Sequence, residues 1–483
     1  MLRILLFLPL LGAGVILFLP PRAPGLIRAT ATLAAVATVV FATVLVLQFD
    51  ATQTGVQFFE THTWNPRLGT SFSLGLDGLS APMVLLAALL CLVAVLASGN
   101  IRERAKGYYL LLLLLEASLI GVFSARDWSL FYVFWELTLI PLFFLIDRWG
   151  GEQRHRAALN FVLYTMGGSV FMLMALLAVY DITNAFSFDM SALQQAARTL
   201  PLGIQTLLFV GLFIGFGVKM PIVPLHGWLP LAHIEAPVPV SILLSGILLK
   251  MGSYGLLRAA ELLPQAMVTA SFWLAVIGIV SILYGAVLAW RQHDLKAMIA
   301  YSSISHMGIV LFALATLTPA GLTGAVMQMI AHGFTAGLLF LVAGLIYERT
   351  HTRDLAAISN LRERSPRLAF LVAIAFLAGL GQPGTAGFVA EMHALLGGLE
   401  RFGAWIALLG IGMLISAAYA LRTVGRLLAG PRQAREPLPA LCHAEFTAAA
   451  LLVIGIITLG VWPSPALNLI QGSITGLVKL FPG

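Results

Sequence analysis

The sequence lacks the residues and motifs with which a protein carries out redox or nucleotide chemistry by itself. Cys91 and Cys442 are its only two cysteines, whereas an iron–sulfur cluster takes about four protein ligands. The chain also has neither a P-loop nor a glycine-rich dinucleotide-binding fingerprint. We therefore expect no cofactor in this chain, and any electron transfer linked to it must take place in a partner.

Charged residues are also scarce, at 10% of the 483 residues, while 59% are hydrophobic. An average soluble domain has about 25% charged residues, so this chain cannot cover its surface with side chains that bind water. We expect one polytopic transmembrane domain over residues 1–483, with the lipid bilayer as its surroundings. The net charge of +7 does not indicate nucleic-acid binding, because the basic residues are scattered through short loops and form no basic stripe.

Segments of about 17 to 25 apolar residues can cross the hydrocarbon core of a membrane, and we expect fourteen such helices in an all-α fold. The first contains Arg3 and an apolar run, but no small-residue cleavage site follows, so we read it as a span and not as a signal peptide. Residues 463–483 are expected to be a surface tail. The expected spans are 3–20, 28–48, 79–98, 108–125, 128–147, 159–180, 203–229, 238–258, 270–290, 297–316, 322–346, 368–393, 403–425 and 444–462.

An even number of spans places both termini on one side of the membrane, and the positive charges in the loops indicate which side. Most of these charges fall opposite the termini, among them Arg102, Arg104, Arg154, Arg156, Arg362, Arg364, Arg432 and Arg435. Few fall on the side of the termini. Because positively charged loops are retained in the cytoplasm, we expect both termini on the non-cytoplasmic side.

Two of the expected spans are interrupted by helix-breaking residues. In the seventh, Pro221 and Pro224 follow directly after Lys219, and in the twelfth the glycine-rich segment 379–387 precedes Glu391. Proline removes a backbone donor and clashes with the preceding helical turn. Irregular backbone inside a membrane occurs only where protein buries it or where it lines a hydrated cavity, so both breaks are expected to border a functional site.

The two breaks lie five spans apart. Because five is odd, a first unit over residues 108–258 and a second unit over residues 270–425 would have opposite orientations in the membrane. Such inverted repeats are common in transporters.

Lys219 and Lys250 are the only two of the 28 lysines and arginines that fall in the interior of the expected spans, because the others lie in loops or close to the ends of spans. Ionisable groups in a membrane are costly and usually handle ions or protons. Taken singly, each has a structural explanation, such as a static ion pair or a hydrogen bond between helices. The whole set occupies seven spans, more than helix packing needs, and it predicts a conduction path: Glu116, Glu136, Lys219, Lys250, His306, His332 and Glu391.

The chemistry of such a path follows from desolvation. Burial favours the neutral form of lysine and glutamate, whereas a nearby opposite charge favours the charged form. A buried pair such as Glu136 and Lys219 can therefore be poised between protonation states and switched when a neighbouring charge moves. Lysine suits this role because arginine stays protonated and could not relay a proton.

Four segments together resemble one family: 134–141 around Glu136, 219–230 after Lys219, 248–250, and 384–391 before Glu391. The chain is similar to the antiporter-like proton-pumping subunits of complex I, and most of all to the M-type, or chain 4, subunits of NADH/NAD(P)H-quinone oxidoreductases. The resemblance implies a fourteen-helix fold with two inverted five-helix repeats. It also implies other membrane-arm subunits as partners, and partner subunits that carry iron–sulfur clusters and use a quinone.

The resemblance assigns roles to individual residues. It implies that Glu136 and Lys219 are a coupling pair, that Lys250 and His306 form a central relay, and that Glu391 is the exit-side residue. His332 and Glu116 match the family less closely. Glutamate at position 391 favours the M-type, since lysine is found there in sodium/proton antiporters and other pumping subunits.

The sequence departs from the family at Leu231, where an aspartate is usual. The change removes a carboxylate near His233 on the charge-rich side. The sequence therefore does not determine the route by which protons enter. Together with segment 387–391, this departure resembles the cyanobacterial photosynthetic complex, including its carbon-dioxide-uptake form. The expected location is a bacterial inner membrane or a cyanobacterial thylakoid membrane, with ferredoxin and plastoquinone, or NADH and another quinone, as the partners' substrates.

Two other functions remain open at this point. A secondary cation/proton antiporter would use the same buried charges without redox partners. A non-conducting scaffold would need them only for assembly, in which case Glu136→Gln would alter assembly and not proton flux.

Overall fold

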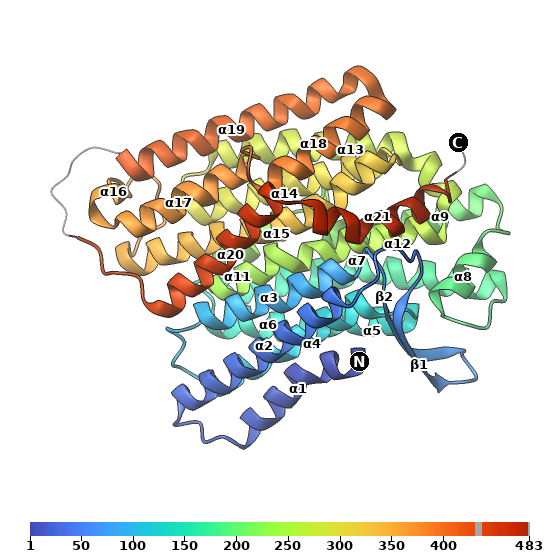
Figure 1. Ribbon diagram of the computed structural model, residues 1–483, viewed down its shortest axis with the longest axis horizontal. Coiled ribbons are helices and arrows are strands. Elements are labelled where there is room, and N and C mark those ends of the chain that lie inside the picture. Colours follow the sequence, from blue (N-terminus) through green and yellow to red (C-terminus); the bar gives the residue numbers. More distant parts are fainter. Residues whose placement is uncertain (430–436, 482–483) are drawn as a thin grey trace.

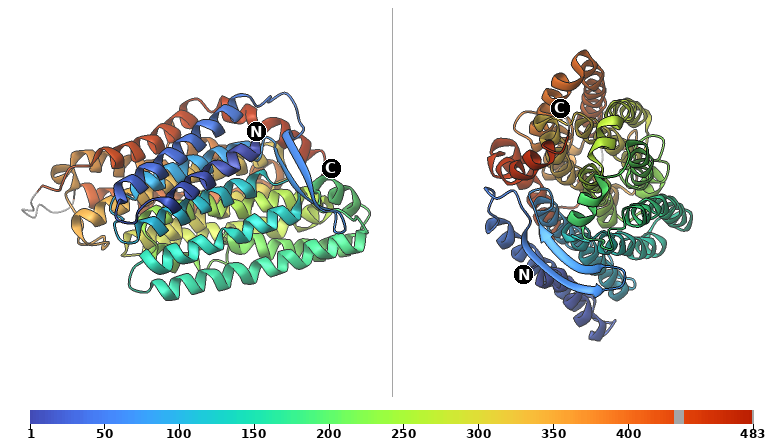
Figure 2. Two further views of the ribbon diagram at one scale, coloured as in Figure 1. Left: turned by 90° about the horizontal axis from the view of Figure 1, so that it is seen from below. Right: turned by 90° about the vertical axis from the view of Figure 1, so that its right-hand side faces the viewer.

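The computed structural model describes residues 1–429 and 437–481, so Arg432 and Arg435, which we counted on the charge-rich side, lie outside the described residues. The described part is an elongated bundle of helices that run roughly parallel to one axis, with one β-hairpin at one end (Figures 1 and 2). The helices are α1 (Leu2–Phe18), α2 (Pro24–Leu47), α3 (Ala81–Ala97), α4 (Ala105–Ser124), α5 (Trp128–Leu137), α6 (Leu139–Trp149), α7 (Arg154–Thr183), α8 (Met190–Ala197), α9 (Leu202–Lys219), α10 (Leu229–Glu235), α11 (Val238–Leu243), α12 (Leu249–Leu262), α13 (Pro264–Arg291), α14 (Leu295–Ala315), α15 (Pro319–Thr350), α16 (Leu361–Arg364), α17 (Pro366–Gly379), α18 (Ala386–Phe402), α19 (Ile406–Ala429), α20 (His443–Val461) and α21 (Ser464–Val478).

The expected all-α membrane fold is confirmed. Within the described residues, 11 helical segments are long and apolar enough to cross a membrane, and the shorter apolar helices α1, α3 and α17 accompany them. The number of fourteen spans stays a prediction, as do the two inverted repeats over 108–258 and 270–425. Helices α11, α12 and α15 form the centre of the bundle, where the most apolar stretch of each is fully buried by protein.

Both expected interruptions are present. Helix α9 ends at Lys219 and the next helix begins only at Leu229, while α17 ends at Gly379 and α18 begins at Ala386. A side chain supports the first break: the indole nitrogen of Trp228 donates to the carbonyl of Val218 at 2.8 Å. This bond gives a donor to a carbonyl at the end of α9, where the helix does not continue.

Two further irregularities lie beside site residues. Thr138 separates α5 from α6, and a π-helical turn, η1 (Leu244–Leu248), joins α11 to α12 immediately before Lys250. Pro141 lies in the first turn of α6, where its missing backbone donor costs least. Single π-helical turns inside helices are frequently found at functional sites.

The expected surface tail over 463–483 is wrong. Its residues 464–478 form α21, which packs against α15 and buries Ile470, Ile474 and Leu477 along one face. Pro465 stands in the first turn of this helix, where proline is tolerated. An apolar stripe at spacings of three and four is enough to dock a short helix, although it is too short to cross a membrane.

Strands β1 (Gln57–Asn65) and β2 (Thr70–Leu76) form an antiparallel hairpin between α2 and α3. The hairpin lies at the end of the bundle where α1 begins (Figure 1), and the Met1 amino group contacts Glu60 there. At the same end, Asp127 begins α5 and accepts hydrogen bonds from both the backbone and the hydroxyl of Ser71. The hairpin is thus fastened to the helical bundle.

Candidate functional site

Lys219 is the last residue of α9, and its side chain is 1% exposed. Its ammonium donates to the Thr138 hydroxyl at 3.3 Å and lies 5.2 Å from the ring centre of Trp135 and 5.8 Å from that of Phe161. A cation against aromatic faces in a desolvated site is stabilised by the ring quadrupoles. The break after α9 and the interruption at Thr138 therefore meet at one charge.

Glu136 lies on α5, two residues before Thr138. No salt bridge joins it to Lys219 within the part of the chain that the structure describes, but the two charges act on each other electrostatically. One oxygen of Glu136 is buried without a hydrogen-bond partner. The pair is therefore close enough to couple and is not locked by a direct contact.

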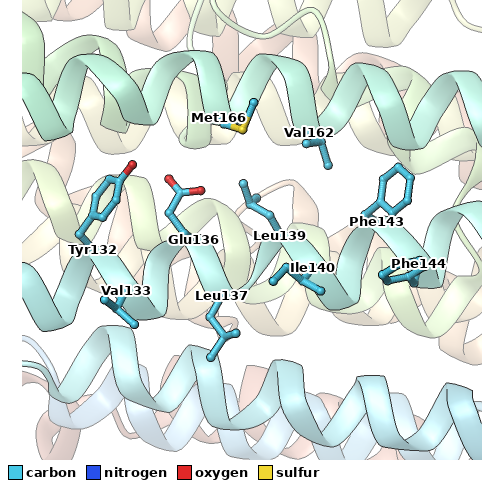
Figure 3. A pocket seen from close by; sticks show the side chains of 10 residues that line it. All are labelled: Tyr132, Val133, Glu136, Leu137, Leu139, Ile140, Phe143, Phe144, Val162 and Met166. Carbon is cyan, nitrogen blue, oxygen red and sulfur yellow. The ribbon is translucent and has the colours of Figure 1, made fainter.

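The Glu136 carboxylate also faces a cavity of about 640 Å³ between α5, α6 and α7. Figure 3 shows the carboxylate and the Tyr132 hydroxyl pointing toward α7, where Val162 and Met166 lie. The remaining lining is apolar, with Phe143 and Phe144 at one end of it. Glu136 thus reaches the outer face of the bundle, while Lys219 is enclosed.

Lys250 is fully buried in the first turn of α12. Its ammonium donates to the Ser245 carbonyl at 2.5 Å and to Nδ1 of His332 on α15 at 2.6 Å. The Ser245 carbonyl lies in the π-helical turn η1. The sequence offered no partner for Lys250, and the structure places an imidazole there.

His306 on α14 continues the contact from His332, since the centres of the two imidazole rings are 5.2 Å apart. Its Nδ1 lies 2.8 Å from the Ser302 carbonyl and its Nε2 lies 3.2 Å from the Gly379 carbonyl. A neutral imidazole can donate only one of these hydrogen bonds, whereas an imidazolium can donate both. The two carbonyl groups can therefore stabilise the imidazolium form of His306.

Gly379 ends α17, so His306 touches the second break directly. Two residues later, Gly381 has a φ of +67°, and a Cβ added there would lie 2.1 Å from Oε2 of Glu391. The turn thus folds over the buried carboxylate of Glu391. Lys250, His332, His306 and the break beside Glu391 form one sequence of polar groups across the second half of the bundle.

Glu116 lies apart from this path. It is fully buried on α4, and neither carboxylate oxygen has a hydrogen-bond partner among the described residues. Its charge acts on Cys91 of α3. The structure brings Glu116 into contact with none of the other predicted site residues, and its role stays a prediction.

Two buried groups on the charge-rich side were not among the site residues predicted from the sequence. Lys296 in the first turn of α14 is 6% exposed and donates to the Ala236 carbonyl at 2.8 Å. His233 on α10 is fully buried, stacks on Phe340, and has no hydrogen-bond partner at either ring nitrogen among the described residues. The charges of Lys296 and Lys250 both act electrostatically on His233, so His233 lies near both lysines.

Lys296 also lines a polar cavity of about 630 Å³ together with Glu235 and Arg353. The cavity opens between the ends of α6 and α7 on one side and α10, α14 and α15 on the other. Leu231, the departure noted in the sequence, is half-buried against the apolar core and offers no polar group here. A hydrophobicity profile assigns Lys296 to a loop because it is the first charged residue outside the apolar run, so only the fold reveals its burial.

No metal centre accompanies these groups: in residues 1–429 and 437–481, no three His, Cys, Asp or Glu side chains are placed to hold an ion. The arrangement offers three lysines, three histidines and two glutamates that can bind and release protons: Lys219, Lys250, Lys296, His233, His306, His332, Glu136 and Glu391. Two helix breaks adjoin them. Such a set is suited to moving protons, and it contains no group that accepts electrons.

Two family models match the chain. Residues 25–122 match the amino terminus of NADH-ubiquinone oxidoreductase chain 4, and residues 125–416 match the transmembrane family NADH:quinone oxidoreductase/Mrp antiporter. Among curated proteins, NADH-quinone oxidoreductase subunit M of Rhodobacter capsulatus is 39% identical over 496 residues, covering 99% of this chain and 96% of its own length. The NAD(P)H-quinone oxidoreductase chain 4 2 of Thermosynechococcus vestitus is 39% identical over 495 residues, covering 99% and 92%.

Solved structures agree with these matches. A chain of respiratory complex I from Thermus thermophilus with bound NADH superposes with a TM-score of 0.92 at 32% identity, over 100% of both chains. A chain of the Mrp complex from Dietzia sp. superposes with a TM-score of 0.85 at 25% identity, over 98% of this chain and 52% of that one. The family models and the long, full-coverage relatives leave one conclusion: the chain belongs to the NADH:quinone oxidoreductase/Mrp antiporter family of membrane proteins.

Proposed function

We propose that this chain is a membrane-arm subunit of a complex I-type quinone oxidoreductase and that it translocates protons when electrons move in partner subunits. The observation that carries the proposal is the chain of contacts that runs from Lys250 through His332 and His306 to the second helix break. Relatives that match this chain over nearly its whole length are named as subunits of quinone oxidoreductases. The iron–sulfur clusters and the quinone site would belong to partner subunits, as would the nucleotide or ferredoxin site.

In this mechanism, the Glu136–Lys219 pair is the switch. A partner subunit would cover the apolar cavity at Glu136. A positive charge arriving in that partner would draw the Glu136 carboxylate away from Lys219, and loss of that charge would let the carboxylate return. Because Thr138 and two aromatic faces are the only groups of the described residues that contact the ammonium, the loss of a nearby negative charge favours release of its proton. The switch thus converts charge movement at the outer face into proton movement inside.

Protons would be taken up from the polar cavity beside Lys296 and reach the centre through His233. Lys250 would then pass a proton to His332, and His306 would carry it to the Gly379 break, where Glu391 releases it toward the other side. A histidine with a free ring nitrogen can accept a proton on one nitrogen and deliver one from the other. In this uptake route, Lys296 and His233 would take the place of the aspartate that is usual at position 231.

The same proposal covers placement in the membrane and internal organisation. Units 108–258 and 270–425 would be inverted repeats, each with its own broken helix and buried lysine or glutamate. Both termini would lie outside the charge-rich compartment. The membrane would be a bacterial inner membrane or, in a photosynthetic setting, a thylakoid membrane with plastoquinone as acceptor.

Lys219→Ala tests the proposal in the assembled complex in sealed vesicles. Proton translocation driven by quinone reduction is expected to fall by roughly tenfold or more, since positioned proton-transfer groups typically contribute at least that much. Lys219→Arg keeps the charge but cannot release the proton, so it should fail as well. Lys479→Ala, an exposed lysine after α21, is the matched control. Full pumping by either Lys219 variant would contradict the assigned role.

A secondary cation/proton antiporter is the second candidate, because the matched family includes Mrp antiporters and a chain of an Mrp complex shares the fold. It predicts proton flux driven by a sodium or potassium gradient without any quinone turnover. Vesicles that contain the purified assembly, without electron donor, distinguish the two. Proton flux that follows an imposed cation gradient, with no quinone reductase activity in the sample, would support the antiporter.

A further inference from the structure

A small basic cavity lies at the charge-rich end of α13 and α19, away from the proton path. Its volume is about 100 Å³, roughly three times the volume of one water molecule in the liquid. Three arginines line it, Arg291 at the end of α13 and Arg422 and Arg426 in the last turns of α19. Its other polar and aromatic lining residues are Trp290, Gln292, His293, Tyr419 and Thr423.

These three arginines have no partner in residues 1–429 and 437–481. Within the described residues none of them forms a salt bridge or a hydrogen bond, and all three are exposed. Other arginines on the same side are paired: Arg349 with Glu445 at 2.7 Å and Arg353 with Asp294 at 3.2 Å. Asp294, the acidic residue nearest to Arg291 in sequence, is thus already engaged. Three guanidinium groups line one cavity, and no acidic side chain of the described residues lines it with them, so the cavity is complementary to an anion.

An apolar surface leads up to the cavity. On α13, Val280, Tyr284 and Val287 are exposed at spacings of four and three, so they form a stripe that ends at Arg291. On α19, Ile411, Leu414 and Leu421 are exposed. Deeper in the bundle the two helices touch, because a Cβ at Gly412 would lie 2.2 Å from Ile282. The two helices pack side by side (Figure 1).

We propose that this cavity binds the phosphate group of an anionic phospholipid, with the acyl chains along the exposed faces of α13 and α19. Arginine offers planar, bidentate donors that match phosphate oxygens. Basic pockets between membrane helices on the cytoplasmic side suit anionic headgroups. Trp290 and Tyr284 are aromatic side chains of the type that gathers at the membrane–water boundary.

The apolar stripe decides between a lipid and a free anion. A soluble phosphate would gain from the arginines alone, and it would not need the 42–48% exposed side chains of Val280, Tyr284 and Val287 beside them. A phospholipid covers these side chains and neutralises the arginines at once. The inference is independent of the proposed proton path.

The test compares R291Q/R422Q/R426Q with R102Q/R104Q/R156Q in the complete purified complex. The control removes three exposed arginines on the same charge-rich side, which likewise form no hydrogen bond or salt bridge with the described residues. Binding of phosphatidylglycerol is measured by native mass spectrometry in nanodiscs, beside phosphatidylcholine and beside inorganic phosphate as competitor. Each basic residue near an anionic surface contributes about fivefold, so the triple variant is expected to bind phosphatidylglycerol roughly 100-fold more weakly.

The control variant should bind as the natural protein does, and R291K/R422K/R426K should retain most of the binding because the charges remain. Equal retention of phosphatidylglycerol by the glutamine variant would overturn the proposal, and so would equal binding of phosphatidylcholine. Displacement of the bound lipid by millimolar inorganic phosphate would show a site for a free anion and would overturn the lipid assignment.

Discussion

Gly381 has a φ of +67° and lies against the carboxylate of Glu391, and both properties require glycine. A side chain at this φ costs about 1 kcal/mol or more, and its Cβ would occupy the position of Oε2. Gly384 in the same turn has a φ of +91°, but a Cβ there would meet no atom within 4 Å. Substitutions at the two glycines therefore distinguish the effect of backbone strain from the effect of contact with Glu391, the proposed exit residue.

We predict that Gly381→Ala lowers proton translocation by roughly tenfold, equivalent to about 1.4 kcal/mol of barrier, because the Glu391 carboxylate must leave its position under the turn. Gly384→Ala should lower it by less than about twofold, since it introduces similar backbone strain without displacing Glu391. Proton pumping per quinone reduced, measured in sealed vesicles, checks both. Equal losses in the two variants would show that strain in the turn matters and contact with Glu391 does not.

The sequence revealed which buried residues are unusual but not how they pair. Lys219 and Lys250 stand out because a cation in an apolar run is costly wherever it lies. The contact between Lys250 and His332 joins residues 82 positions apart, and it depends on how α12 packs against α15. His233 was not singled out as a site residue, because it lies on a short helix outside the expected spans and its stacking on Phe340 exists only in the folded chain.

The sequence predicts where the break between α9 and α10 lies. It does not predict which side chains stabilise that break. Pro221 and Pro224 forbid a continuous helix, so a break near Lys219 follows from backbone chemistry. The bond from the Trp228 indole to the Val218 carbonyl, ten residues earlier, appears only in the folded chain. Trp128 is an equally buried tryptophan, at 1% exposure, whose indole nitrogen has no partner among the described residues.

We predict that Trp228→Phe destabilises the protein by about 1 kcal/mol more than Trp128→Phe, because only the first variant removes a hydrogen bond and leaves a buried carbonyl without its donor. Both variants lose the same ring area, so the difference isolates the bond. Thermal unfolding of the purified complex, followed by loss of the assembled state, measures it. If the two variants unfold at the same temperature, the indole bond does not hold the break.

Elements outside the spans were the hardest to predict. The hairpin β1–β2 has no clean alternation, since two irregularities in its register shift the pairing. It is held by Asp127 and by contacts that join distant parts of the chain. Helix α21 has too few apolar residues for a span, and its buried face becomes visible only against α15. In both cases tertiary contacts, and not local pattern, decide the structure.

At the scale of the whole molecule, one buried ion cluster joins three distant parts of the chain. Asp77 follows the hairpin and accepts from Arg258 of α12 at 2.6 Å and from Arg126, between α4 and α5, at 3.0 Å. Arg258 is 1% exposed and also pairs with Glu261 at 2.9 Å. Burial alone would raise the pKa of Asp77, but the two guanidinium groups outweigh it and hold that pKa well below its usual value.

We predict that Asp77→Asn destabilises the protein by about 3 kcal/mol at neutral pH, because it removes one partner of a buried ion pair and keeps the side-chain shape. Asp181→Asn, at an exposed aspartate near the end of α7, is the control and should change stability little.

A carboxylate whose folded pKa is depressed contributes its full stabilisation above the unfolded pKa of about 3.9. The contribution is lost as pH falls from there toward the folded pKa. The difference in thermal stability between the natural protein and Asp77→Asn should therefore be constant from about pH 5 to 8 and shrink below about pH 4. A difference that instead grows toward low pH would mean that Asp77 is not the ionised centre that ties the hairpin to α12.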